Sequence, residues 1–266
     1  MQLSNSNRAN LALAVLLLAG VIAGCSGSRP TPPAPSAGTQ SQSQSAAMPS
    51  GSEGQQIRLG KLIFDQTPKY ASAYVGNRLS CSDCHIRSGT AAHAAPMIDI
   101  ANIFPLYSKR AGRVISLQER FQECFTRSEN GSPLPRDSEE MKALTAYVDW
   151  LSRDGVKGQA YKGRGLVKLP ALTGDPGKGK AIYASQCSSC HGVDGAGIPP
   201  VLPPLWGQNS YNDGAGMDKP EKMAAFLIHN MPQNHPDTLT PQDAFNVAAF
   251  VHTMPRSKFN QAYKGY

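Results

Sequence analysis

The sequence contains two short runs that each combine two cysteines and a histidine in the order Cys-x-x-Cys-His. The residues that make up the two runs are Cys81, Cys84, His85, Cys187, Cys190 and His191. This order is typical of a c-type haem attachment site. Two thiols about one helical turn apart can add to the two vinyl groups of one porphyrin, while the adjacent histidine binds the iron. The sequence therefore predicts two covalently bound haem c groups, around which the chain must fold.

A single structural zinc site made by both cysteine pairs is the alternative interpretation. The two pairs are separated by far more than the roughly 15 to 20 residues that are usual in such sites. Each pair also carries its own histidine, which one four-ligand zinc site does not need. Haem attachment is therefore the interpretation that we retain.

The N-terminus has the features of an export signal. One basic residue, Arg8, precedes an apolar stretch over 11–22 that is too short to span a bilayer. The stretch leads into Ala23, a glycine and Cys25, which resembles the lipobox of bacterial lipoproteins. We expect a signal peptide over residues 1–24, lipidation of Cys25 and a membrane-anchored protein in the periplasm. Cleavage of an ordinary signal peptide near Ala23 is the alternative, and it gives the same compartment.

Residues 25–54 consist largely of Ser, Pro, Gln, Gly and Ala and lack apolar periodicity. Such a segment cannot bury a core, so we expect a disordered tether behind the lipid anchor. The formal net charge of the chain is +7. No basic run is long enough to indicate nucleic-acid binding, and the charge favours attraction for small anions.

The surroundings of the two motifs repeat. A Gly-Lys pair begins a short amphipathic stretch upstream of each motif, at Gly60 and at Gly179. Apolar residues at helical spacing follow downstream of each motif, over 141–151 and 243–254. This repeat resembles the small class I cytochrome c fold, so we predict a mainly α protein with two tandem cytochrome c domains, each with one haem. The expected boundaries are 55–155 for the first domain, 156–176 for a linker and 177–266 for the second domain.

Cys124 has no cysteine left to pair with if four cysteines hold haem and Cys25 is lipidated. An unpaired thiol in an exported protein is a candidate functional group. Leu117, Phe121 and Phe125 recur with Cys124 at helical spacing on one face. Cys124 should therefore point inward, toward the first haem. The alternative is that it serves only as a small buried hydrophobic side chain.

The residues around Cys124 resemble a known family. Two segments carry the resemblance, Phe104 to Arg110 and Leu117 to Gly131, together with the order of the two haem motifs. They look like the dihaem, tetrathionate-forming thiosulfate dehydrogenases. The resemblance implies that Cys124 is the sixth ligand of a catalytic first haem and that Arg110 and Arg120 bind thiosulfate. It also implies that the second domain transfers electrons.

The chemistry of these residues agrees with that role. Arg120 is one helical turn before Cys124, so both side chains can face one cavity. Guanidinium groups bind small oxyanions such as the thiosulfate dianion through paired hydrogen bonds. Cationic neighbours and ferric iron favour thiolate at Cys124, which makes it both a ligand and a nucleophile. Arg127 lies four residues after Glu123, and we expect these two to form a surface ion pair.

The iron of the second haem needs a sixth ligand besides His191. We predict Met231, because it precedes the last helix, where small cytochromes c carry their ligand methionine, and because thioether ligation raises the haem potential. Asn230 precedes it, so a lysine that exchanges with the methionine at this point is not expected. The other candidates are Met217, Lys222, Met223, His229, His235, His252 and Met254.

Together, these inferences predict an enzyme in which electrons pass from the first haem to the second. Two thiosulfates would be coupled to tetrathionate, and two electrons would leave through the first and then the second haem to a periplasmic cytochrome c or similar acceptor. The reverse reaction, tetrathionate reduction, is also open. A dihaem electron carrier without catalysis and a dihaem cytochrome c peroxidase are the alternatives. The latter requires an open distal site, which a sixth ligand from Cys124 would occupy.

Overall fold

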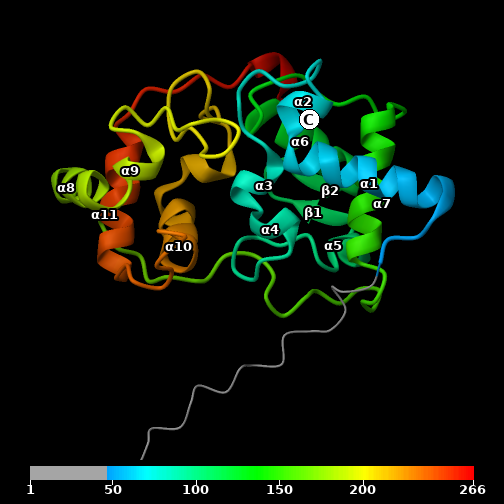
Figure 1. Cartoon of the computed structure of the whole chain (residues 1–266), viewed down its shortest axis with the longest axis horizontal. Helices are drawn as coiled ribbons and strands as arrows, with labels where there is room; N and C mark the ends of the chain where they lie inside the picture. Colours follow the sequence, from blue (N-terminus) through cyan, green and yellow to red (C-terminus); the bar gives the residue numbers. More distant parts are fainter. Residues whose placement is uncertain (1–46) are drawn as a thin grey trace, which may run out of the picture. The chain divides into compact units, whose positions relative to one another are not determined.

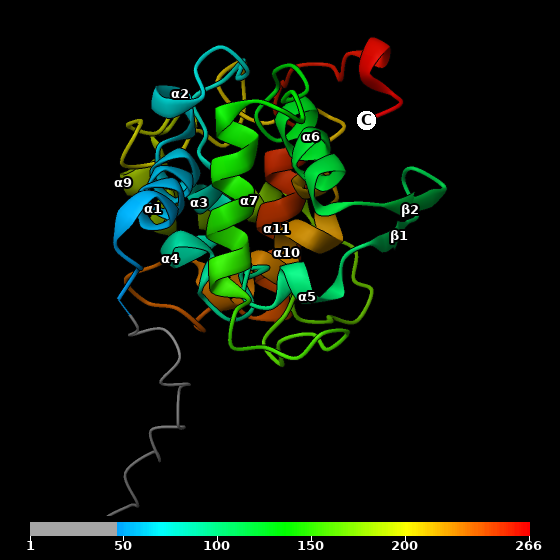
Figure 2. The ribbon, with the colours of Figure 1, turned by 90° about the vertical axis from the view of Figure 1, so that its right-hand side faces the viewer.

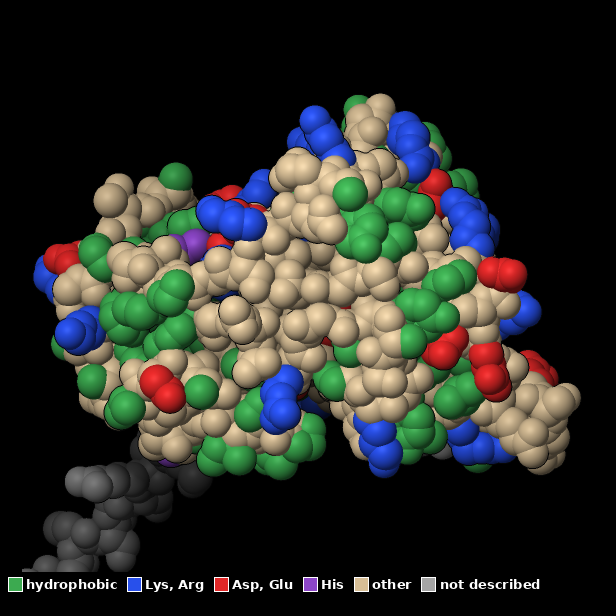
Figure 3. All heavy atoms as spheres, turned by 90° about the horizontal axis from the view of Figure 1, so that it is seen from above, with side chains coloured by type: hydrophobic (Ala, Val, Ile, Leu, Met, Phe, Trp, Pro, Cys, Tyr) green, Lys and Arg blue, Asp and Glu red, His purple; other side chains and the backbone are tan. Residues whose placement is uncertain are grey.

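The structure, a computed structural model, describes residues 47–266 and is mainly helical in that part of the chain (Figure 1). The expected signal peptide, Cys25 and all but the end of the expected tether lie outside the described residues. Among the helices that are described, none is long and apolar enough to cross a membrane. On the face drawn in Figure 3, lysine and arginine side chains are scattered among acidic and apolar ones.

The first half of the chain is built on two helices that pack against each other, α1 (Gly51–Asp65) and α7 (Glu139–Leu151). Their contact is close because Gly60 has no side chain. A Cβ at this position would lie 2.0 Å from the carbonyl oxygen of Ala143. Buried side chains of both helices, such as Phe64 and Leu144, then form one core with α6 (Leu117–Arg127). The short helices of this half are α2 (Thr67–Tyr70), α3 (Cys81–Cys84), α4 (Ile86–Gly89) and α5 (Ile100–Ile103).

The second half repeats this arrangement with α8 (Pro176–Gln186) and α11 (Pro241–His252). Gly179 permits the contact, since a Cβ there would lie 1.9 Å from the carbonyl oxygen of Asn246. The predicted glycine repeat is thus a repeat of helix crossings. The remaining elements of this half are α9 (Ser188–His191), η2 (Gly216–Asp218), α10 (Pro220–Asn230) and η3 (Gln261–Tyr263).

A small antiparallel hairpin, β1 (Leu106–Ser108) and β2 (Arg113–Ile115), precedes α6 (Leu117–Arg127). The sequence did not indicate this hairpin, because strands of three residues are too short to show an alternating pattern. Ser116 begins α6 with a capping box, in which its hydroxyl accepts from Glu119 N and the Glu119 carboxylate accepts from Ser116 N. Figure 2 shows the hairpin extending from the helices beside α6.

The two halves share packing and hydrogen bonds within one compact unit. Leu79, which lies just before the first haem motif, is buried in the core of the second half with Tyr211. The Asn212 amide nitrogen donates to Thr126 O at 2.9 Å and to Asn130 Oδ1 at 3.0 Å. The end of α6 is therefore fixed to a loop of the second half.

Two helices begin slightly before the domain boundaries expected from the sequence. α1 begins at Gly51, inside the range 25–54 expected to be disordered, because Gly54 packs against the carbonyl of Pro49 and Ile57 reaches the core. The expected linker 156–176 ends inside a helix, since Asp175 caps α8 by accepting from Gly177 N and Lys178 N. The linker is also held to the first half by backbone hydrogen bonds. Its Gly163 and Gly165 carbonyls accept from His93 N and Ala95 N.

Candidate functional site

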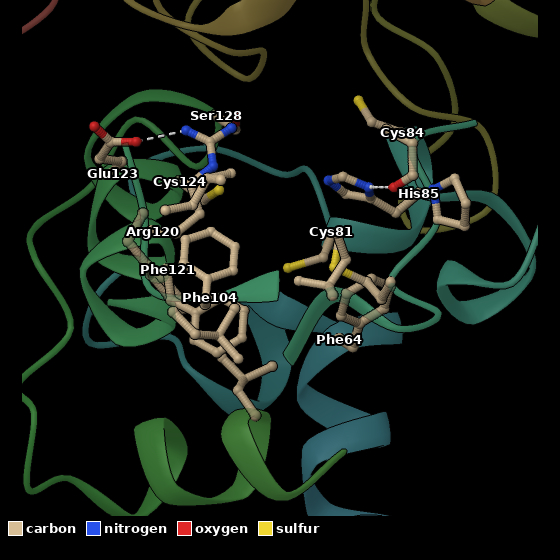
Figure 4. A pocket seen from close by; sticks show the side chains of 18 of the residues that line it. Phe64, Cys81, Cys84, His85, Phe104, Arg120, Phe121, Glu123, Cys124 and Ser128 are labelled. Atoms are coloured by element: carbon tan, nitrogen blue, oxygen red, sulfur yellow. Dashed lines mark hydrogen bonds and ion pairs between the residues drawn. The ribbon is translucent and has the colours of Figure 1, made fainter. Parts of the chain in front are cut away.

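A cavity of about 630 Å³ lies between the first haem motif and α6. Cys81, Cys84 and His85 line one side of it (Figure 4). Cys124 and Arg120 line the other side, together with apolar side chains of α6 such as Phe121. The structure therefore brings Cys124 into the same cavity as the first haem motif, on the opposite wall.

Local interactions hold the first motif at the cavity wall. Ser80 caps α3, and its backbone nitrogen donates to the Asp83 carboxylate at 2.8 Å. Cys81 N donates to the Thr67 hydroxyl at 3.1 Å, which fixes the helix to the segment after α1. The two cysteines of the motif then project from a single helical turn.

The hydrogen bonding and burial of His85 suit a metal ligand. Its Nδ1 lies 2.6 Å from the carbonyl oxygen of Ala95 and must donate to it, which leaves the Nε2 lone pair for iron. Burial lowers the pKa of His85 to about 4, so the ring is neutral at physiological pH. Ala95 N in turn donates to Gly165 O, so the segment between the two halves supports the loop that orients this histidine.

The cavity fits a haem. Its volume lies in the range of roughly 300 to 1,000 Å³ that cofactor sites occupy, and most of its lining is apolar. It offers two thiols at the spacing for thioether formation and a neutral imidazole. The two Cys-x-x-Cys pairs do not join in one site, since the described residues contain no group of three or more His, Cys, Asp or Glu side chains placed to hold a metal ion. The five described cysteines form no disulfide.

Arg110 and Arg120 come together through one carboxylate. Glu123 is buried, with 2% of its side chain exposed, and its Oε2 lies 2.6 Å from Arg120 Nη1 and 3.9 Å from Arg110 Nη1. The two arginine side chains are 30% and 45% exposed, so they remain accessible to a soluble anion. Arg120 lines the cavity itself, whereas Arg110 lies on the hairpin turn outside the lining.

The charged groups of this cluster affect one another. The interaction with Cys124 is the largest cause that raises the pKa of Arg120, burial opposes it, and the bond to Glu123 adds to the rise. Burial and the neighbouring charge of Arg120 lower the pKa of Arg110. Two guanidinium groups and one thiol are thus close enough to interact, with Glu123 balancing one of the positive charges.

The expected surface ion pair between Arg127 and Glu123 is wrong. Arg127 is 4% exposed, its Nη1 donates to the Thr126 hydroxyl, and its guanidinium lies 4.4 Å from the centre of the Phe259 ring. Glu123 bonds to Arg120, one turn earlier on the same face of the helix. Spacings of three and four residues both allow a pair on a helix, and the C-terminal segment around Phe259 decides between them by covering Arg127.

The second motif has the same local design as the first. His191 Nδ1 lies 3.0 Å from the carbonyl oxygen of Pro203, and burial lowers the pKa of His191. Trp206 and Tyr183 pack side by side next to this motif, with ring centres 5.2 Å apart. Cys187 and Cys190 of this motif are both free thiols, as the first motif's cysteines are.

Met231 ends α10 as its C-cap and is half-buried. It is not part of the second hydrophobic core, whereas Met217, Met223 and Met254 all pack in or against that core. His229 pairs with Asp237 and stacks with His93 of the first half. His252 Nδ1 lies 2.6 Å from the Ala248 carbonyl within its own helix. Of the candidate sixth ligands, Met231 is thus the methionine without a packing role in the core.

Sequence reasoning missed two residues of the first cavity. Glu129 lies in its wall, is 2% exposed, and its Oε2 has no hydrogen-bond partner among the described residues. Arg164, from the expected linker, also lines the cavity. No pattern could have identified Arg164, because its approach depends on how a segment without periodicity folds back.

The comparisons with known proteins cover both halves. Residues 69–156 match the family described as SoxA/TsdA, cytochrome c domain, and residues 174–251 match the family described as cytochrome C oxidase, cbb3-type, subunit III. Together with the helical architecture, these matches confirm two cytochrome c domains, which bind haem c.

Characterised relatives match over most of the chain. A thiosulfate dehydrogenase of Stutzerimonas stutzeri is 40% identical over 84% of this chain and 74% of its own length. One from Allochromatium vinosum is 38% identical over 81% of this chain and 84% of its own length. The solved structure of a thiosulfate dehydrogenase (TsdBA) from Marichromatium purpuratum has a TM-score of 0.74 at 37% identity. It is matched over 77% of this chain, which spans 47% of that longer chain.

Proposed function

This chain belongs to the thiosulfate dehydrogenase family, and from that membership we propose that it couples two thiosulfate anions to one tetrathionate and passes two electrons to an external acceptor. The reaction balances as two dianions giving one dianion and two electrons, with formation of one sulfur–sulfur bond. The observation that carries the proposal is the position of Cys124 and Arg120 together in a cavity wall opposite His85.

Each residue of the cavity has one task in this proposal. Arg120, with Arg110 at the rim, binds the oxygen atoms of thiosulfate and offsets the repulsion between two dianions. At an effective dielectric constant near 20 and a separation of 4 Å, one such charge pair contributes on the order of 4 kcal/mol before desolvation. Cys124 presents its sulfur to the terminal sulfur of the substrate, and His85 would hold the haem iron through Nε2. Haem c, when bound, supplies one-electron acceptance beside Cys124 and again at the second site.

We assign the second domain to electron exit, with His191 and Met231 as the iron ligands and Cys187 and Cys190 as the covalent attachment points. The match of residues 174–251 to a second cytochrome c family supports this assignment, because such domains carry electrons. A small periplasmic cytochrome c or similar protein is the expected acceptor. Tetrathionate reduction by the same residues is the reverse of this reaction. The potentials of the two haems decide which direction dominates.

We propose that the protein acts in the periplasm and is lipidated on Cys25. This proposal rests on the sequence alone, on the apolar stretch before Cys25 and the small residues next to it. Incorporation of labelled palmitate into the wild type, and its loss in Cys25→Ala, is the expected result. Equal labelling of both chains would refute lipidation at this position.

Replacing Cys124 is the direct test of the enzymatic function. In Cys124→Gly with both haems attached, we expect thiosulfate oxidation with an artificial acceptor to fall by at least about 100-fold, the scale of a lost catalytic group. Rates of dye reduction and tetrathionate yield are the measurements. Gln118→Gly is the matched control, because it introduces the same helix-weakening residue, worth about 1 kcal/mol, into the same helix outside the cavity.

The alternatives predict other results in that experiment. A plain dihaem electron carrier gives no tetrathionate in either variant, with Cys124 acting as a core residue. A peroxidase turns over peroxide with a reduced donor and leaves thiosulfate untouched. Equal thiosulfate rates in wild type and Cys124→Gly would exclude the proposed role of the thiol.

A further inference from the structure

We propose that Glu123 is the positioning residue of the thiosulfate site, whose buried carboxylate joins the hairpin that carries Arg110 to the helix that carries Arg120. This inference rests on the proposed function, since it assigns a task to the residue between the two expected substrate ligands. It concerns how the anion site is assembled and not the sulfur chemistry.

Glu123 receives donors from two separate elements. From its own helix, Arg120 Nη1 lies 2.6 Å from Glu123 Oε2. From the hairpin, Arg110 Nη1 lies 3.9 Å from the same oxygen, and the Ser108 hydroxyl donates to Glu123 Oε1 at 3.4 Å. Both carboxylate oxygens are therefore engaged, and they bridge β1, the hairpin turn and α6.

The hairpin needs such an anchor. In β2, Arg113 and Val114 are exposed and only Ile115, next to the start of α6, is buried, so little apolar burial holds the turn end of the hairpin against the protein. Its turn is fixed internally by Gly112 N donating to Ser108 O and by Ala111 N donating to the Ser108 hydroxyl. The turn is thus well defined in itself, while its position relative to α6 depends on few contacts, one of which is Glu123.

The charges explain why a carboxylate is required. Arg110 and Arg120 repel each other, and this repulsion is among the causes that lower the pKa of Arg110. Without a negative group between them, the exposed Arg110 would turn toward water and the paired oxyanion site would be lost. Glu123 is 2% exposed while the arginines are partly open, so the carboxylate lies behind them and leaves their outer N–H groups to the anion.

Glu119 provides a matched control on the same helix. It also pairs with two arginines, Arg113 at 2.9 Å and Arg136 at 3.1 Å, but it does not line the cavity. Glutamine preserves the capping box at this position. Glu119→Gln therefore removes two ion pairs of α6, one of them to the hairpin strand β2, and leaves Glu123, Arg110 and Arg120 in place. It shows whether loss of any ion pair between the hairpin and α6 has the same effect as loss of Glu123.

The experiment compares steady-state kinetics of the haem-loaded variants. We expect Glu123→Gln to raise the KM for thiosulfate by about 10-fold while kcat falls by no more than about 3-fold, because binding of the anion and not the sulfur chemistry is weakened. Glu123→Asp, which keeps the charge, should recover part of the loss. Glu119→Gln should keep the wild-type KM. A KM for Glu123→Gln within about 2-fold of wild type, or one below it, would overturn the proposal.

A double-mutant cycle tests whether Glu123 acts through the arginines. In an Arg110→Gln background, Glu123→Gln should raise KM by a clearly smaller factor than in the wild type, since one of the groups that it positions is already gone. Full additivity would contradict a positioning role. If Glu123→Gln does not fold, Ser108→Ala removes the hairpin's hydroxyl contact and should raise KM to a smaller extent, and an unchanged KM there would count against the proposal.

The proposed function and this inference can fail separately. If the wild type does not oxidise thiosulfate, the anion can serve as an unreactive ligand, and its binding to the oxidised protein can be measured directly. Isothermal titration calorimetry with thiosulfate then compares wild type, Glu123→Gln and Glu119→Gln. Weaker binding in Glu123→Gln alone would support the inference without turnover, and equal binding in all three proteins, or none in the wild type, would overturn it.

Discussion

His85 and His191 are each oriented by a backbone carbonyl, Ala95 O and Pro203 O. In both cases burial lowers the pKa of the ring, and the bonded Nδ1 leaves Nε2 as the ligand atom. The two haem sites therefore differ little at the histidine. Their difference lies in the opposite side chain, for which we expect the thiolate of Cys124 at one site and the thioether of Met231 at the other.

Exchange of the expected thioether ligand should change the second haem selectively. In Met231→His, the midpoint potential of that haem should fall by on the order of 100 mV, within the range of roughly 0.8 V that axial ligands span. Redox titration followed by near-infrared spectroscopy measures it. Met254→Leu is the control, because Met254 packs against the second core. Wild-type potentials in Met231→His would assign the ligand to another residue.

Both halves of the protein depend on a helix crossing that admits no side chain at one glycine. In α1 and α7 this position is Gly60, and in α8 and α11 it is Gly179. Helix propensity alone favours alanine at both positions by about 1 kcal/mol. The requirement for glycine thus comes from the approach of a carbonyl of the partner helix, which outweighs the propensity.

Gly60→Ala should therefore destabilise the protein although alanine is the better helix former. Because the new Cβ would lie 2.0 Å from Ala143 O, the helices must separate, at a cost of about 1 to 3 kcal/mol in the free energy of unfolding. Denaturant unfolding of the haem-loaded protein is the measurement. Lys61→Ala, next in sequence and exposed, removes only a surface ion pair with Asp65 and should change stability by less than about 1 kcal/mol. A stabilised Gly60→Ala would mean that α1 and α7 do not touch at this point.

Leu79 joins the two halves of the molecule, because it lies in the first half of the sequence but packs in the core of the second half. Leu79 precedes the first haem motif and is 4% exposed in the second core. Asn212 adds hydrogen bonds from the second half to the end of α6, the helix of Cys124. The geometry between the catalytic cavity and the second haem motif is thus held by buried contacts and not by the connecting segment alone.

Truncating Leu79 should weaken the whole unit and not one half. We expect Leu79→Ala to lower the free energy of unfolding by about 2 to 5 kcal/mol, the usual cost of a buried leucine. Denaturation followed at the absorption bands of both haems should show both transitions moving to lower denaturant concentration. Leu62→Ala, at a position that is 38% exposed, is the control and should have a small effect. A shift of the second haem's transition alone would show that the halves unfold independently.

The sequence by itself determined those features that depend only on residues close to one another in the chain. The spacing of Cys81, Cys84 and His85 predicts haem attachment, and the helical periodicity of α6 puts Cys124 on its inner face, because both depend on neighbours within one helical turn. Only the tertiary structure decided that Glu123 forms ion pairs with Arg110 and Arg120 instead of Arg127, and that the segment around Gly165 supports the loop of His85. Those contacts join elements far apart in the chain. Which of several compatible partners a side chain takes is settled by what is buried around it, and no local pattern records that.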